Sequence, residues 1–229
     1  GEEVTGWSPP PRPPRQVFAG RYVRLEPLEA ARHAAALHEA NAEDVAGAMW
    51  DYMPVGPFPD LAAYRAWAAW AEASADPLFF AAFDRERGRH GGSLSLLRIA
   101  PEAGSIELGY IAWAPLMQRS RAATEAVWLL MDWAFGAGYR RFEWKCNALN
   151  AASRRAALRL GLSFEGVFRQ AQLVKGRNRD TAWYAAIDRE YPALQAAFTA
   201  WLEPGNFDEA GRQRQRLSDR TAGILVARG

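Results

Sequence analysis

The sequence predicts a mixed α/β domain in which helices flank one central sheet of about seven strands. Two patterns carry this prediction. Segments with the two-residue alternation of strands interleave with segments of helical periodicity, and the most apolar helical segment stands between two strand-like runs. In addition, 229 residues suffice for one large core but are few for two complete domains.

The expected elements follow in the order strand, two helices, three strands, helix, strand, helix and two strands. Tyr22 and Val23 alternate with arginines in the first strand, and two alanine-rich helices follow, separated by a loop of proline, glycine and aromatic residues. Turn-like segments divide the next three strands, and Gly161 closes the last helix. We expect strands at 21–28, 78–84, 91–100, 105–113, 140–146, 163–174 and 180–188, and helices at 29–41, 61–74, 122–135 and 150–160.

The chain divides into three expected regions. Residues 1–19 form a proline-rich arm, because "SPPPRPPR" favours polyproline II and offers no apolar surface to a core. Residues 20–203 form the folded domain. Residues 204–229 are expected to be a polar tail that ends in a frayed basic segment.

Composition argues against several classes of protein. The 28 basic and 26 acidic residues nearly balance, which does not support nucleic-acid binding. A single cysteine, Cys146, cannot form an internal disulfide or a zinc cluster, and three scattered histidines show no metal-ligand spacing. No apolar run approaches the roughly 18 residues of a membrane span, and no hydrophobic signal core opens the chain. We expect a cytoplasmic protein without metal, nucleic-acid or membrane partners.

The segment "PLMQRSRAATEA", residues 115–126, opens the most apolar helix. The first turn of a helix has backbone N–H groups without intrahelical partners, and in a β-helix-β unit these groups are well placed to bind an anion. We therefore predict a phosphate or pyrophosphate here; the alternative is that Ser120 only caps a helix beginning at Arg121. The residues expected to contact the anion are Gln118, Arg119, Ser120, Arg121, Ala122, Ala123 and Thr124.

Several further segments carry a recognisable pattern: "IELGYIAW", "QRSRAATEA" and "NAASRRAALRLGLSFEG", followed by "EGVFRQ", "KGRNRD" and "DREYP". With the first three, the chain resembles the GNAT N-acyltransferase superfamily. With the last three, it resembles more closely the branch of Rim-type ribosomal-protein N-terminal acetyltransferases. The resemblance covers 20–192 and implies a mostly antiparallel sheet whose fourth and fifth strands splay around the cofactor. Arg121 departs from the family, whose loop has its first glycine at that position, so the shape of the loop is in question.

The resemblance implies transfer of an acyl group from acyl-CoA, most simply acetyl-CoA, to a primary amine by direct attack in a ternary complex. The acceptor would be a small molecule or a protein N-terminus. The sequence does not distinguish acetyl from a longer acyl group. The alternative is a CoA-binding regulatory or sensory module without catalysis, which only the Arg121 departure favours.

Glu107 is the expected general base. Strict alternation in "SIELGYIAW" puts Glu107 on one face with Ile111 and Trp113, and this face is otherwise mostly apolar. Tyr110 falls on the opposite face. Glu107 matches the strand-four glutamate with which GNAT enzymes often take the amine proton, directly or through water; the alternative is a glutamate paired with an arginine. The resemblance also implies oxyanion donors at the backbone N–H groups of Tyr110 and Ile111.

Asn150 and Ser153 open the last expected helix. Asn150 is expected to cap it, and the resemblance implies that Ser153 faces the CoA thiol and returns a proton to the departing thiolate. The alternative is a capping asparagine beside a serine that takes no part. Cys146 is expected to be a buried small residue and not a nucleophile.

The acceptor side offers aromatic residues in the loop between the first two helices. Trp50, Tyr52 and Phe58 are expected to line the amine pocket, where a charged amine would gain cation–π contact; they could equally cover the edge of the core. The resemblance also implies a homodimer, and Trp70 and Trp201 are large apolar residues that a small domain can leave partly exposed. The alternative is that such exposed residues pack against the proline-rich arm.

Overall fold

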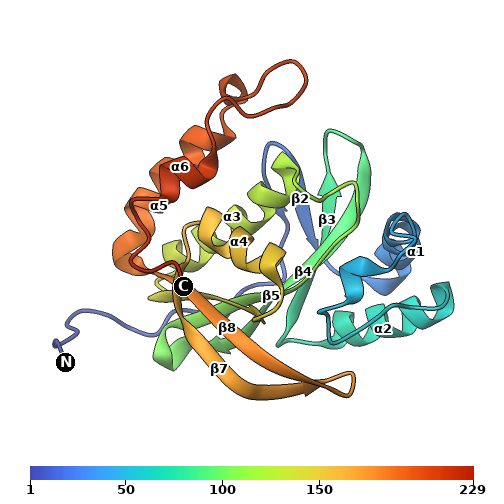
Figure 1. Cartoon of the computed structure of the whole chain (residues 1–229), viewed down its shortest axis with the longest axis horizontal. Helices are drawn as coiled ribbons and strands as arrows, with labels where there is room; N and C mark the ends of the chain where they lie inside the picture. Colours follow the sequence, from blue (N-terminus) through green and yellow to red (C-terminus); the bar gives the residue numbers. More distant parts are fainter.

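One eight-stranded sheet runs through the protein, in the order β1-β2-β3-β4-β5-β6-β8-β7 (Figure 1). The computed structural model describes residues 1–229. Every neighbouring pair is antiparallel except β5 and β6, which are parallel, so the expected mixed and mostly antiparallel sheet is confirmed. The strands are β1 Phe18–Ala19, β2 Val23–Pro27, β3 Leu78–Asp84, β4 Arg89–Ala100, β5 Ser105–Trp113, β6 Arg141–Asn147, β7 Ser163–Val174 and β8 Arg177–Ile187.

Helices cover both faces of the sheet. The four expected helices form within one residue of their predicted ends, but sequence reasoning missed α5, α6 and the two-residue strand β1. Proline at the start and apolar residues at helical spacing mark α5 as a helix, so its signal was present in the sequence. The helices are α1 Ala30–Asn41, α2 Leu61–Ala73, α3 Arg121–Gly136, α4 Ala151–Arg159, α5 Tyr191–Leu202 and α6 Leu217–Thr221, with short 3₁₀ turns η1 Ala48–Trp50, η2 Pro101–Ala103, η3 Asp188–Glu190 and η4 Pro204–Asn206.

Two apolar clusters lie on opposite faces of the sheet. The larger joins the sheet to α3, α4, α5 and α6, and the smaller packs α1, α2 and Trp50 against the other face. As the sequence predicts, α3 is the most buried helix: eleven of its residues are buried, on nearly every side. Such a helix cannot shift without disturbing the whole core, so its first turn is held in a defined position.

Glu125 fixes α3 against the start of the sheet. Its buried carboxylate accepts hydrogen bonds from the backbone N–H groups of Arg21 (2.9 Å), Tyr22 (2.6 Å) and Val23 (2.8 Å). These three donors lie in the turn before β2 and at its first residue. A charged acceptor makes each of these hydrogen bonds stronger than one between neutral groups.

The two ends of the chain pack on the domain more closely than expected. The N-terminal arm is extended, but Trp7 Nε1 donates to the carbonyl of Gly138 and Phe18 is buried in the larger cluster. The polar segment after Pro204 also packs on the domain, because Phe207 and Leu217 are buried in that same cluster. The polar composition of this segment concealed the few apolar residues that anchor it.

Of the two tryptophans expected to be exposed, only Trp70 is, with 49% of its surface accessible. Trp201 is buried and packs edge-on against Phe207, so its proposed exposure is corrected. The C-terminal segment covers Trp201. The sequence of that segment is mostly polar, so it gives little indication that the segment packs on the domain. None of the helices has the combination of length and apolarity that a bilayer crossing requires.

We expect Glu125→Ala to lower the free energy of unfolding by about 3 kcal/mol or more, because three backbone donors would lose a charged partner in a buried place. Urea denaturation measures the change. The matched control is Glu102→Ala, since Glu102 is exposed and makes no hydrogen bond; its effect should stay within about 0.5 kcal/mol. Equal effects of the two substitutions would contradict this role of Glu125.

Candidate functional site

The main cleft opens where β5 and β6 separate. The two strands pair only from Ser105 to Leu108 on β5, although β5 continues to Trp113. Beyond Leu108, the backbone groups of β5 that face β6 therefore have no strand partner. A cleft of about 2200 Å³ occupies this region and extends along α3, α4, the β7–β8 hairpin, the loop after α1 and residues between 209 and 216. The predicted splayed cleft is confirmed.

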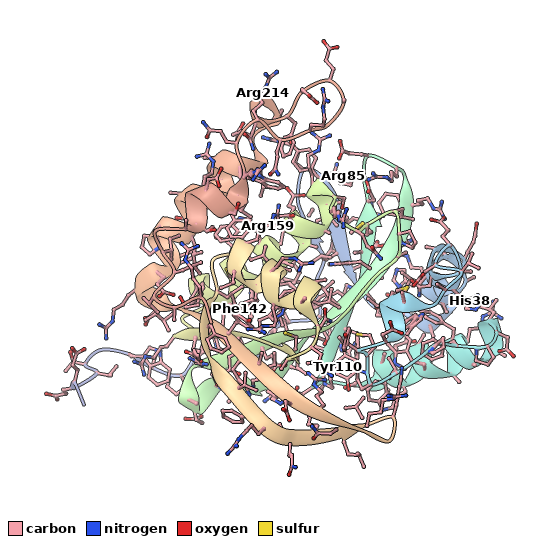
Figure 2. The ribbon with its side chains drawn as sticks, viewed as in Figure 1. His38, Arg85, Tyr110, Phe142, Arg159 and Arg214 are labelled. Atoms are coloured by element: carbon pink, nitrogen blue, oxygen red, sulfur yellow. The ribbon has the colours of Figure 1, made fainter.

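A β-bulge shapes the wall of this cleft. Ser95 faces Gly109 and Ser93 faces Ala112, so two residues of β5, Tyr110 and Ile111, stand opposite one residue of β4. Tyr110 has φ of +50°, in the left-handed region that side chains other than glycine rarely adopt. The ring of Tyr110, labelled in Figure 2, packs edge-on against Phe79. Such strain is found most often where a protein positions a ligand.

The bulge also corrects the predicted faces of β5. Ile106 and Leu108 lie in the larger cluster, and Ile111 packs against that same cluster. Tyr110 and Ala112 belong to the smaller one. Strict alternation had placed Glu107 and Ile111 on the same face; the extra residue turns Ile111 and Trp113 to the opposite face. Sequence alternation cannot reveal an inserted residue of this kind.

The start of α3 leaves backbone donors free. Ser120 is the N-cap: its Oγ accepts from the N–H of Ala123 at 3.0 Å and donates to the carbonyl of Met117 at 2.7 Å. Ser120 therefore caps the helix, and its hydroxyl and the Ala123 N–H are already engaged. The backbone N–H groups of Arg121 and Ala122 make no hydrogen bond, and Arg121 lines the cleft. These N–H groups are an anion-binding arrangement.

Arg121 does not extend into the anion site. Its guanidinium pairs with Glu86 and lies over the rings of Tyr22 (4.8 Å) and Phe207 (4.5 Å). The side chain thus holds the C-terminal segment against α3. Arg121 itself begins the helix and needs no glycine, whereas the positive φ of this loop falls on Arg119 (+58°), which is exposed. Gln118, next to it, donates to the carbonyl of Trp113.

Arg159 is a site residue that sequence reasoning missed. It lies on α4 beside the first turn of α3, where its Nη1 donates to Thr124 Oγ1 at 3.2 Å (Figure 2). It forms no ion pair, it lines the cleft, and burial lowers the pKa of its guanidinium. Ser153, Ala156 and Arg159 recur every three residues, which places them along one face of α4 and was the available signal. A half-buried cation without an anion is costly, and a bound phosphate would remove that cost.

Glu107 lies at the floor of the cleft between two cations. Its Oε2 accepts from Arg98 Nη1 at 2.6 Å and from Lys145 Nζ at 2.8 Å. Lys145 also pairs with Glu143 at 2.6 Å, and it lies 3.6 Å from the centre of the Trp183 ring. Burial opposes the charge on Glu143, but hydrogen bonds from Arg141 and Lys145 outweigh it and hold its pKa below the usual value. Glu107 Oε1 makes no hydrogen bond within the protein, so it is the oxygen open to a ligand.

Asn150 and Ser153 adopt the predicted relation. Asn150 Oδ1 caps α4 by accepting from the N–H of Ser153 at 3.0 Å. Ser153 Oγ accepts from Trp144 Nε1 at 2.9 Å, which leaves the hydroxyl proton free for another acceptor. Burial raises the pKa of the neighbouring Cys146 thiol, while the Ser153 hydroxyl acts in the other direction. Cys146 is buried, as expected.

Of the three aromatic residues expected at the acceptor pocket, only Tyr52 lines the cleft. Trp50 is 5% exposed, and Phe58 packs against it and against Tyr64. The assignment of Trp50 and Phe58 to the pocket is therefore corrected: they form the core that supports the loop. Lys175, in the turn between β7 and β8, donates to the carbonyl of Trp50 at 3.0 Å and joins the hairpin to this loop across the cleft.

A separate cluster of Glu26, His33 and His90 has the residue types of a metal site. However, His33 Nδ1 accepts the backbone N–H of Glu29 at 3.0 Å, so the neutral ring carries its proton on Nε2. That nitrogen then has no lone pair for a metal and instead faces Glu26 Oε2 at 3.4 Å. Arg32 also binds the Glu26 carboxylate, at 2.6 Å. The cluster is a buried network of hydrogen bonds and charges, not a cation site.

The fold and cleft belong to one class of protein, the acetyltransferases. The model of the acetyltransferase (GNAT) domain matches residues 23–163, more than half of the chain. The chain therefore belongs to the GNAT family and is an N-acetyltransferase by family. No curated protein matches the chain.

Solved structures agree with this assignment. A GCN5-related N-acetyltransferase from Brucella melitensis is 47% identical, with a TM-score of 0.93, over 96% of this chain and 100% of that one. A GNAT-family protein from Chromobacterium violaceum is 39% identical, with a TM-score of 0.78, over 84% and 96%. The Salmonella typhimurium acetyl transferase that modifies the N-terminal serine of ribosomal protein L7/L12 is 20% identical, with a TM-score of 0.64, over 75% and 99%. The Rim-like resemblance is thus confirmed for the fold.

Because the His33 ring is neutral in the folded protein, we expect the stability of the protein to depend on pH. Burial, followed by the charges of His90 and Arg32, lowers the pKa of His33 below 6.5, while Glu26 acts in the other direction. As the pH falls below 6.5, the unfolded chain takes up a proton that the folded chain does not. The free energy of unfolding should therefore fall by up to about 1.4 kcal/mol per pH unit.

Urea denaturation between about pH 8 and about pH 5 measures this slope. His33→Gln should flatten it, whereas the control His38→Gln should not, because His38 lies outside the cluster. An unchanged slope in His33→Gln would show that other groups cause the dependence.

Proposed function

We propose that this protein transfers an acetyl group from acetyl-CoA to a primary amine by direct attack within a ternary complex. The observation that carries the proposal is the separation of β5 from β6 beside the uncovered N–H groups of α3. The opening supplies a slot for an extended thioester, and the helix start supplies an anion site at its end. The proposal concerns the donor, the kind of acceptor and the route of the proton.

The phosphates of the donor are proposed to lie at the start of α3. Donors on offer are the N–H groups of Arg121 and Ala122 and the guanidinium of Arg159. Arg214 and Arg216, in the C-terminal segment, also line the cleft and form no ion pair. Figure 2 labels Arg214. Anionic oxygen atoms would satisfy these donors, and the helix dipole favours the same charge.

The reacting carbonyl is proposed to lie at the bulge of β5. The backbone N–H groups of Tyr110 and Ile111 would donate to the oxyanion. An oxyanion hole requires donors that are held rigidly, and the bulge would hold these two. Glu107 would take the amine proton at Oε1, directly or through water, because Arg98 and Lys145 already hold Oε2. Ser153 would protonate the departing thiolate with the proton that its bond from Trp144 leaves free. The acceptor would enter past Tyr52, as a small molecule or a protein N-terminus.

Acetyl-CoA in large excess should raise the thermal unfolding temperature, and Arg159→Met should remove much of this shift. Losing a charged donor should raise the dissociation constant about tenfold or more. Without cofactor, the variant should unfold at the same or a higher temperature, because a half-buried unpaired cation is gone.

Thermal denaturation and isothermal titration measure both effects. The control is Arg65→Met, an exposed arginine on α2 outside the cleft. If acetyl-CoA leaves the wild-type unfolding temperature unchanged, the proposed donor is wrong. If it binds but no amine promotes release of the thiol, the chain binds CoA without catalysis.

Glu107→Gln should lower turnover by roughly a hundredfold or more, the usual effect of losing a general base, and should remove the acidic limb of the pH profile. Acetyl-CoA affinity should change little, because Glu107 lies away from the start of α3. Thiol release over a range of pH gives these values. Ser153→Ala is the comparison: it should slow the reaction more modestly and keep the acidic limb. Near-normal turnover in Glu107→Gln, with that limb intact, would show that Glu107 is structural.

A further inference from the structure

One face of β8 carries three buried polar atoms without partners. They are Arg179 Nε, Thr181 Oγ1 and Trp183 Nε1, and no protein group accepts from or donates to any of them. Few buried polar atoms in a folded protein lack a partner, so three in one row call for an explanation. All three residues line the main cleft.

The regular pairing of β8 explains why the three atoms form a row. Asn147 stands opposite Thr181 and Lys145 opposite Trp183, without a register shift between β6 and β8. Residues two apart on such a strand point to the same side. The row therefore lies on the face of the sheet where Lys145 meets Glu107, next to the proposed position of the amine.

The row consists mainly of donors. The N–H groups of Arg179 and Trp183 can only donate, and the hydroxyl of Thr181 can do so. Burial is the main reason that the pKa of Arg179 is lowered, and no carboxylate pairs with this guanidinium. Glu107 is the carboxylate whose charge acts on it, but Arg98 and Lys145 already hold Glu107. A negatively charged ligand group with several hydrogen-bond acceptors would satisfy these three donors.

We propose that Arg179, Thr181 and Trp183 bind the carboxylate of the acceptor, so that the acetylated amine belongs to an amino acid. This inference rests on the proposed function and specifies its substrate class. The Nε edge of a guanidinium presents two parallel N–H groups that match the two oxygens of a carboxylate. Thr181 and Trp183 continue the row toward Lys145 and Glu107, where the amine would lose its proton.

The test compares standard L-amino acids with their amides, which keep the amine and the side chain but lack the charge. Isothermal titration in the presence of CoA measures binding without turnover, and thiol release with acetyl-CoA measures kcat/KM. We expect at least one amino acid to bind and react about tenfold or more better than its amide. Ethanolamine phosphate tests whether a phosphate serves instead of a carboxylate.

Arg179→Met should abolish the preference for the carboxylate, and Thr181→Val should reduce it severalfold. Both variants should keep the acetyl-CoA thermal shift. The matched control is Arg177→Met on the same strand, because Arg177 is exposed and does not line the cleft; it should behave as wild type.

Three results would overturn the assignment. The first is that amino acids and their amides bind equally well, or that neither binds, while acetyl-CoA still stabilises the protein. The second is a preference that survives in Arg179→Met, and the third is a preference for the phosphate. Loss of the acetyl-CoA shift in Arg179→Met would assign the row to the cofactor. Failure of the proposed function has a different sign: acetyl-CoA then leaves the unfolding temperature of the wild type unchanged. In that case the titration of amino acids and amides still decides whether the row binds a carboxylate.

Discussion

The short parallel pairing of β5 and β6 is the constraint on which the rest of the site depends. Four residue pairs join the strands before they separate, and the salt-bridged Glu107 and Lys145 stand close to the point of separation. Lys145 also binds Glu143 and rests on Trp183, so one buried ammonium ties β5, β6 and β8 together. Because the Lys145 ammonium is buried and paired with two carboxylates, it stabilises the floor of the cleft even without a ligand.

The uncompensated cations give the cleft its chemical character. Arg159 lies beside the start of α3 and Arg179 on β8, and neither has an acidic partner, in contrast to Lys145. At these two places the cleft carries a positive charge that no acidic side chain neutralises and that a bound ligand could neutralise. If the phosphates of the acetyl donor bound Arg159 and the carboxylate of the amine substrate bound Arg179, the thioester and the amine would meet near the bulge of β5.

Most of the fold was predictable from local pattern. The strands and the first four helices follow from alternation, helical spacing and the capping residues Ser120 and Asn150, which act within a few residues of chain. The bulge at Tyr110 was not predictable, because an inserted residue leaves the sequence pattern almost unchanged while it reverses the faces of Ile111 and Trp113. The packing of Phe207 and Leu217 was missed because polar neighbours dominate their segment.

For the site, the sequence by itself determined the family and the residues that act through local geometry. Ser120, Asn150 and Ser153 lie where their motifs predict. Only the tertiary structure decided which charges are paired. In the folded chain Arg121 pairs with Glu86 and lies over two aromatic rings. Trp50 is buried with Phe58 packed against it, and Arg159 and Arg179 have no acidic partner. The physical reason is that capping needs neighbours within one turn of chain, whereas ion pairing and burial depend on groups that only the folded chain brings together.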